Sequence, residues 1–114
     1  MPELNEKQKE KLSELGAYVF NDSDGKALNL NRERRPPTKI KHYDDYAYYD
    51  GEWIIGTDIR EGKAKMIFLE DLYEGWLNNN KMAIRGRKIN VLDGYIYDGE
   101  LDNDKPNGKG TLKV

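Results

Sequence analysis

The sequence predicts a mainly β protein: an elongated, single-layer antiparallel sheet of tandem β-hairpins, preceded by a short helix and an extra hairpin. The first observation is a five-residue motif that recurs at a step of 24 residues, in Tyr49-Asp-Gly-Glu-Trp53, Tyr73-Glu-Gly-Trp-Leu77 and Tyr97-Asp-Gly-Glu-Leu101. The second is a glycine column at the same step, formed by Gly62, Gly86 and Gly110. A period in this range is typical of a repeat array, in which each unit buries a core only by stacking on its neighbours.

Each repeat predicts one β-hairpin. Tyr49, Gly51 and Trp53 are two residues apart, so they share one face of a strand, and the second and third repeats reproduce this spacing. The segment 102–107 is rich in turn-forming residues and predicts the turn of the third hairpin. Asp93-Gly94 predicts a tight turn between the second and third repeats. The motif glycines leave room for a tyrosine ring to lie across the backbone.

The second repeat departs from the pattern of the other two. Lys88 and Asn90 stand where the other repeats carry apolar residues, while Ile89 and Val91 lie one step away. Because a slip of one residue moves side chains to the opposite face, we expect a β-bulge near Arg85–Lys88 or a sheet with apolar groups on both faces.

The third repeat, from Tyr97 to Leu112, resembles the MORN repeat, whose pattern is Tyr-x-Gly, a polar turn, then Gly-x-Gly and an apolar residue. The first repeat has Arg60 and Gly62 in place of the Gly-x-Gly pair, and the second has Ile84 and Gly86. The resemblance covers residues 49–114. It implies an interaction module of cytoskeletal, ciliary or membrane-apposed assemblies.

Residues 1–42 are expected to form a separate N-terminal region, and residues 43–114 the array. Residues 2–15 predict a helix, with Pro2 in its first turn and Gly16 at its end. Its apolar side is narrow, so it docks either on the array or on a partner. Segments 17–20 and 26–30 predict a hairpin around the loop 21–25. An EF-hand interpretation of that loop fails, because Phe20 and Asn31 would occupy positions that require carboxylates.

Residues 31–41 predict a basic connector, since Pro36 and Pro37 are incompatible with a helix or a central strand. The alternative is a docking site for an acidic surface or for phosphates. The chain contains no cysteine, which excludes disulfides and thiolate metal sites and fits an intracellular, cytoplasmic protein. No secretory signal and no apolar run of about 20 residues is visible, so we expect a soluble chain.

We expect neither enzymatic activity nor a cofactor. His42 is the only histidine, and the sequence has no nucleophile–base pair, phosphate-binding glycine loop or metal-ligand spacing. The net charge of −2 also argues against nucleic-acid binding.

Two functional hypotheses remain. In the first, the protein is a scaffold that binds a partner peptide or helix on an aromatic sheet face, because Tyr and Trp dominate interface energetics. The residues expected to bind the partner are Tyr46, Tyr48, Tyr49, Trp53, Tyr73, Trp76 and Tyr97. Of these, Trp76, Tyr48 and Tyr46 are predicted on the face opposite Tyr49 and Tyr73.

In the second hypothesis, Arg85, Arg87 and Lys88 form a basic patch that docks on anionic phosphoinositide membranes, assisted by the connector 32–41. Lipid docking would weaken sharply with ionic strength, whereas aromatic binding would not. A weaker alternative is a subunit of a large complex that the helix and the connector anchor. Val114 ends a predicted edge strand, which favours either a homodimer or a partner strand at that edge.

Overall fold

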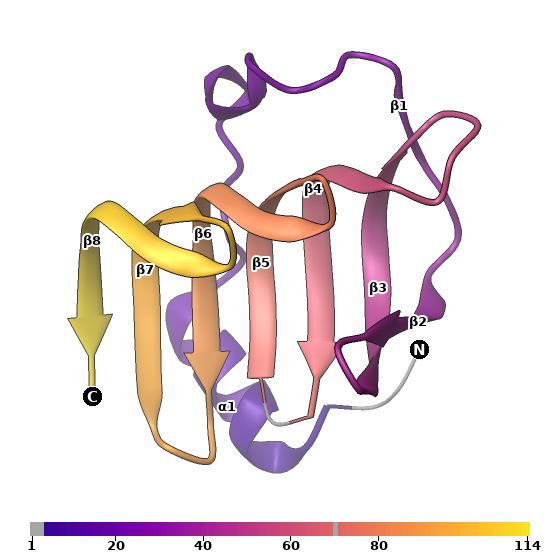
Figure 1. Ribbon diagram of the computed structural model, residues 1–114. Coiled ribbons are helices and arrows are strands. Elements are labelled where there is room, and N and C mark those ends of the chain that lie inside the picture. Colours follow the sequence, from indigo (N-terminus) through magenta and orange to yellow (C-terminus); the bar gives the residue numbers. More distant parts are fainter. Residues whose placement is uncertain (1–3, 70) are drawn as a thin grey trace.

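A computed structural model describes residues 4–69 and 71–114 and shows one open antiparallel sheet with a single α-helix behind it (Figure 1). The mainly β fold class is therefore confirmed. Adjacent strands follow the order β1-β3-β4-β5-β6-β7-β8, and β2 also pairs with β3. The elements are α1 (Glu6–Leu15), the 3₁₀ turn η1 (Asp22–Gly25), β1 (Arg32–Arg34), β2 (Thr38–His42), β3 (Asp45–Ile54), β4 (Arg60–Phe68), β5 (Asp71–Asn78), β6 (Lys81–Asn90), β7 (Tyr95–Asp102) and β8 (Lys105–Lys113).

The three predicted hairpins are present as β3–β4, β5–β6 and β7–β8. Two-residue turns close the second and third hairpins, at Asn79–Asn80 and Asn103–Asp104, and all four residues have positive φ. Positive φ at both central positions defines the type I′ turn, and Asn and Asp tolerate that conformation well. The third turn is shorter than the predicted segment 102–107, and β8 already begins at Lys105.

The second repeat contains a β-bulge, as predicted, but the first and third hairpins have register shifts at the equivalent positions, so the bulge is common to all three repeats. Gly75 pairs with Gly86, but the next residue, Trp76, pairs with Ala83, so Ile84 and Arg85 together oppose a single step of β5. Ile84 has a φ of 67°. Beyond the bulge, the sheet also buries apolar side chains on both of its faces. The second repeat thus has both a β-bulge and apolar side chains on both faces of the sheet, the two alternatives that its sequence suggested.

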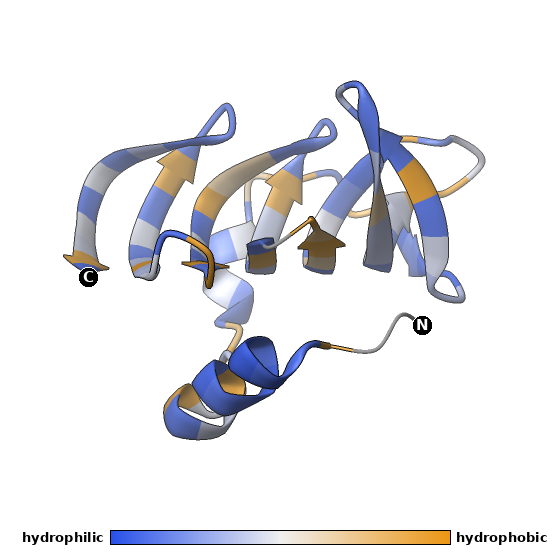
Figure 2. Cartoon of the chain, turned by 90° about the horizontal axis from the view of Figure 1, so that it is seen from below, coloured by the Kyte–Doolittle hydropathy of each residue, from blue (hydrophilic) through white to orange (hydrophobic). Residues whose placement is uncertain are grey.

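The strands curve away from α1, so we call the face that carries α1 convex and the other face concave (Figure 2). The concave face holds the larger cluster, which includes Tyr49, Trp53, Tyr73, Tyr97 and Leu101. On the convex face, Leu12 and Leu15 of α1 pack against a second cluster formed by Leu72, Ile89 and Val91. The helix therefore docks on the array. The molecule measures 37 × 31 × 26 Å, so three hairpins give a compact body rather than the expected elongated one.

Helix α1 begins later than predicted. Asn5 caps it, because its side chain accepts a hydrogen bond from the Gln8 backbone N–H while the Gln8 side chain accepts one from the Asn5 N–H. Gly16 ends the helix as predicted, with its N–H donating to the Leu12 carbonyl at 2.8 Å. The prediction for Pro2 lies outside the described residues.

The hairpin predicted over residues 17–30 is wrong. Residues 17–21 form no strand, and the polar loop forms η1 instead. The segment packs on the sheet rather than on itself, because Phe20 lies edge-on to Trp76 at 5.8 Å and Asp22 pairs with Lys63 at 2.6 Å. The aromatic residue Phe20 therefore serves a contact with the convex face of the sheet and not a strand pairing.

The connector predicted over residues 31–41 is also largely structured. β1 pairs with β3 from Arg32 to Arg34, and β2 pairs with β3 from Thr38 to His42. Both segments lie along the same outer edge of β3, and Pro36 and Pro37 interrupt them. Proline is compatible with this position, since an edge strand has a side that needs no donor.

Candidate functional site

The three repeat tyrosines form a structural ladder through the concave face. Their hydroxyl groups donate to backbone carbonyls three residues onward: Tyr49 to Glu52 at 2.6 Å, Tyr73 to Trp76 at 2.7 Å and Tyr97 to Glu100 at 2.7 Å. Burial raises the pKa of Tyr49 and Tyr73 well above the usual value of a phenol. These hydroxyl groups remain neutral donors, so they hold the strands and are not available to a ligand.

Each tyrosine ring lies over two small residues on paired strands. Gly75 pairs with Gly86, and Gly99 pairs with Gly110. In the first hairpin, Gly51 pairs with Ala64 rather than with the predicted column residue Gly62. The loop of that hairpin is longer, so the column seen in the sequence shifts against the structural one. Gly62 instead has a φ of 111° and lies against the Glu52 carboxylate.

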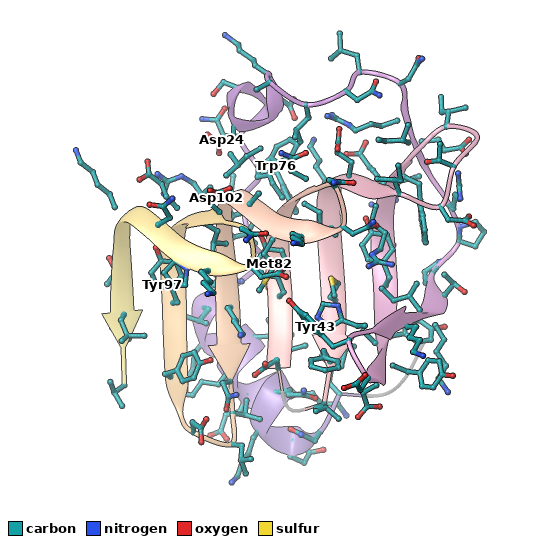
Figure 3. All side chains as sticks on the ribbon, in the orientation of Figure 1. Asp24, Tyr43, Trp76, Met82, Tyr97 and Asp102 are labelled. Carbon is teal, nitrogen blue, oxygen red and sulfur yellow. The ribbon has the colours of Figure 1, made fainter. Side chains whose placement is uncertain are left out.

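The exposed aromatic face expected for partner binding is absent at most of its predicted residues. Trp76 is only 1% exposed, and η1 covers it, as Figure 3 shows at Asp24. A Cβ atom at Gly25 would lie 2.7 Å from Cη2 of Trp76, so this turn fits closely on the indole. The chain itself also buries Tyr49, Trp53, Tyr73 and Tyr97. Of the seven predicted residues, Tyr46 is 55% exposed and Tyr48 is half-buried.

The predicted basic patch is divided between the two faces. Arg87 is buried on the convex face, where it pairs with Glu74 at 2.9 Å and donates to the Gly16 carbonyl at 2.7 Å. Lys88 lines the concave face and lies 3.7 Å from Asp71. Arg85 is the most exposed of the three and lies 4.0 Å from Glu100. Alternation along β6 therefore separates Lys88 from Arg85 and Arg87, which line one cavity on the convex face, so the three charges do not share one surface.

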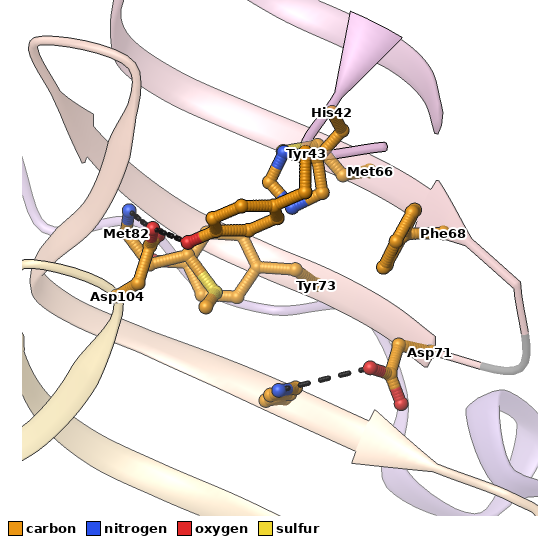
Figure 4. Close-up of a pocket in the computed structure, with 9 residues that line it drawn as sticks. His42, Tyr43, Met66, Phe68, Asp71, Tyr73, Met82 and Asp104 are labelled. Atoms are coloured by element: carbon orange, nitrogen blue, oxygen red, sulfur yellow. Dashed lines mark hydrogen bonds and ion pairs between the residues drawn. The ribbon is translucent and has the colours of Figure 1, made fainter. Parts of the chain in front are cut away.

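A small pocket of about 140 Å³, lined by apolar and charged side chains, opens on the concave face beside Tyr73 (Figure 4). Tyr43, in the turn after β2, donates its hydroxyl hydrogen bond to Asp104, in the turn before β8. His42 packs edge-on against the rings of Tyr43 and Phe68, each at 4.6 Å. Burial lowers the pKa of His42, and Asp104 partly opposes that shift. The Tyr43–Asp104 hydrogen bond thus joins the turn after β2 to the turn before β8 across the concave face.

The candidate binding site is an apolar groove of about 550 Å³ that continues from the smaller pocket towards β8. The two cavities share Lys88 and Asp104. The groove is lined mainly by apolar side chains of β7, of β8 and of the residue that follows β8: Tyr95, Tyr97, Leu101, Pro106, Leu112 and Val114. Leu112 is 63% exposed and Val114 is 99% exposed, so this end of the concave face has no cover among the described residues.

The groove ends at the open edge of the sheet. β8 pairs with β7, and the outer side of β8 has no partner strand in the described parts of the chain. All nine residues of β8 are exposed. An uncovered apolar groove beside unpaired backbone groups is a surface on which an extended segment can bind.

The sequence predicted one part of this site and missed the rest. The alternation through Leu112 and Val114 and the edge position of β8 were visible in the sequence. The groove was not, because it depends on the curvature of the sheet (Figure 2) and on side chains from two strands and from the turns beside them. The Tyr43–Asp104 contact joins residues 61 positions apart and left no local signal.

The fold defines a tandem β-hairpin protein with an uncovered apolar groove beside β8. No model of a known protein family matches the chain, and a search of curated proteins finds no match either. The MORN assignment therefore rests on the repeat pattern. Within residues 4–69 and 71–114, no helix is long and apolar enough to cross a membrane, and no three metal-ligating side chains gather into a site.

Proposed function

We propose that this protein is a non-enzymatic interaction module that binds a partner segment in the concave groove at the β7–β8 end of the sheet. The observation that carries the proposal is the groove itself, because Leu112 and Val114 leave its apolar lining open to solvent. Exposed apolar surface of this kind is typical of interaction sites. The MORN resemblance supports the same class of function.

The proposal moves the binding surface away from the aromatic residues that the sequence suggested. Tyr97 keeps a role, since its ring forms part of the groove while its hydroxyl holds the hairpin. The buried residues Trp53, Tyr73 and Trp76 act as scaffold beneath this surface. Of the original partner residues, Tyr46 is exposed on β3, away from the groove.

Docking on anionic lipid is a less favoured alternative. It needs Arg85, Arg87 and Lys88 on one surface, whereas Arg87 is buried in its pair with Glu74 and Lys88 lies on the concave face. An intracellular assembly, cytoskeletal or membrane-apposed, is the setting that the repeat resemblance implies. It forms part of this proposal.

A photo-crosslinking amino acid at Leu112 tests the proposed groove. The matched control carries the same group at Leu30, which is more exposed but lies in the N-terminal segment. We expect a partner to crosslink from position 112 and not from position 30. The purified partner should then bind the native chain and bind Leu112→Asp at least tenfold more weakly, since a buried carboxylate opposes apolar contact. Equal crosslinking from both positions would contradict the proposal.

A further inference from the structure

Charge on the convex face alternates from strand to strand. The first strand of each hairpin carries acidic side chains and the second carries basic ones. Cross-strand neighbours follow the line Asp50, Lys65, Glu74, Arg87 and Asp98 from β3 to β7. A parallel line joins Arg85 to Glu100. Opposite charges directly across a sheet stabilise strand pairing, so this alternation favours the observed strand order.

The line itself ends on β8 at the uncharged Thr111, which pairs with Asp98, but β8 carries lysines on either side of that position. On the convex side it carries Lys105, Lys109 and Lys113, while Pro106 and Leu112 face the concave groove. Lys105 lies opposite Asp102 on β7. Neither Lys109 nor Lys113 has an ion pair among the described residues. β8 therefore presents two unpaired positive charges beside an open edge.

From this pattern we infer that the partner of β8 is an extended acidic strand that adds to the outer edge of the sheet. Its alternate residues would be acidic, facing Lys109 and Lys113, and apolar, filling the groove beside Leu112. The inference rests on the proposed groove and specifies its ligand. Backbone pairing supplies affinity in such strand addition, and side chains on the two faces supply specificity.

A second copy of the chain does not have this chemistry at either outer edge. Two β8 strands would bring the lysines of one copy beside those of the other. In the part of the chain that the structure describes, the opposite edge of the sheet offers no acidic strand either, since β2 carries Lys39 and Lys41, and β1 carries Glu33 between two arginines that pair with Glu52 and Asp50. Like charges at a strand interface are unfavourable. The preferred occupant is therefore an acidic segment of another protein rather than a homodimer.

The chain supplies its own probe sequence for this site. Residues 97–102, Tyr-Asp-Gly-Glu-Leu-Asp, form the acidic strand that already pairs with β8 on its inner side. A synthetic peptide of this sequence is titrated into the ¹⁵N-labelled protein. The charge-swapped peptide Tyr-Lys-Gly-Lys-Leu-Lys serves as the matched probe. We expect the acidic peptide to shift the β8 amides and slow their hydrogen exchange, with at least tenfold weaker binding of the basic peptide.

The double variant Lys109→Glu/Lys113→Glu should reverse this preference. The control Lys26→Glu/Lys41→Glu makes the same change in net charge at exposed sites away from the groove, and it should leave the preference intact. Equal binding of both peptides, shifts outside β7 and β8, or no binding of either would overturn the inference. Failure of the Leu112 crosslink would instead overturn the proposed function, so the two failures are distinguishable.

Discussion

The ring of Tyr73 lies over Gly86 on the neighbouring strand, and a Cβ atom at residue 86 would stand 2.6 Å from Cζ of that ring. No real side chain tolerates such a separation, so either the ring or the strand must move. We predict that Gly86→Ala lowers the free energy of unfolding by about 1–3 kcal/mol, as overpacked cores do. Urea denaturation measures the change.

The same substitution in a Tyr73→Leu background separates ring contact from backbone effects. The smaller side chain removes the atoms that the new methyl group would meet. Gly86→Ala should then cost clearly less than it does beside Tyr73. An equal cost in both backgrounds would show that the ring does not determine the need for glycine.

The buried Glu74–Arg87 pair provides a second prediction. Both side chains are more than 90% buried, and Arg87 also donates to the Gly16 carbonyl at the end of α1. Arg87→Ala leaves a buried carboxylate without its partner, so we expect a loss of about 3–5 kcal/mol of stability. Arg85→Ala is the matched control on the same strand. Its pair with Glu100 is exposed and long, so its loss should stay below about 1 kcal/mol.

A third prediction concerns the N-terminal segment that covers Trp76. Gly25→Ala places a methyl group 2.7 Å from Cη2 of the indole and should lift η1 from the sheet. In a Trp53→Phe background, the remaining tryptophan emission should move to longer wavelength and become accessible to acrylamide. Lys26→Ala, at an exposed neighbouring position, should leave both signals unchanged. An unshifted spectrum in Gly25→Ala would mean that the indole stays covered.

The buried tyrosines predict loss of stability in alkaline solution. Desolvation raises the pKa of Tyr49 and Tyr73 in the folded state above the usual value of 10, so the folded chain retains protons that the unfolded chain releases. Stability is fully present below pH 10 and falls as the pH rises beyond it, by about 3 kcal/mol per pH unit for the two groups together. Denaturation at several pH values measures this slope. Burial also raises the pKa of Tyr18, to about 12, so this residue adds to the measured slope. Tyr73→Phe should therefore remove about one third of the slope just above pH 10, and an unchanged slope would contradict the assignment.

The sequence predicted the hairpins well because their signals are local. Tyr97, Gly99 and Leu101 alternate within one strand, and Asp93-Gly94 marks its preceding turn. The apolar cluster on the second face was also predictable, since Ile89 and Val91 stand one step out of line, whereas the bulge occurs in all three hairpins and has no such signal. Each of the predictable features depends on residues that are close in the chain.

The predictions failed where contacts are long-range. Phe20 packs on Trp76, and that contact determines the conformation of a segment whose own pattern suggested a hairpin. Arg87 and Lys88 are adjacent in sequence, yet β6 directs them to opposite faces. Exposure of an aromatic residue was therefore the least predictable property, because it depends on which distant segment covers it.

The alternation of charge from strand to strand also makes the two strands of each hairpin different: the first is acidic and the second is basic. A hairpin inserted in its natural order would join an acidic leading strand to the basic trailing strand before it. A hairpin inserted in the reverse order would place its basic strand next to the basic strand of the preceding hairpin, and no acidic side chains would lie between the two. Duplicating a whole hairpin in the same order would therefore preserve the pairing of opposite charges, whereas inverting one would not. The charged side chains of the convex face thus determine the order in which hairpins can be added to the array.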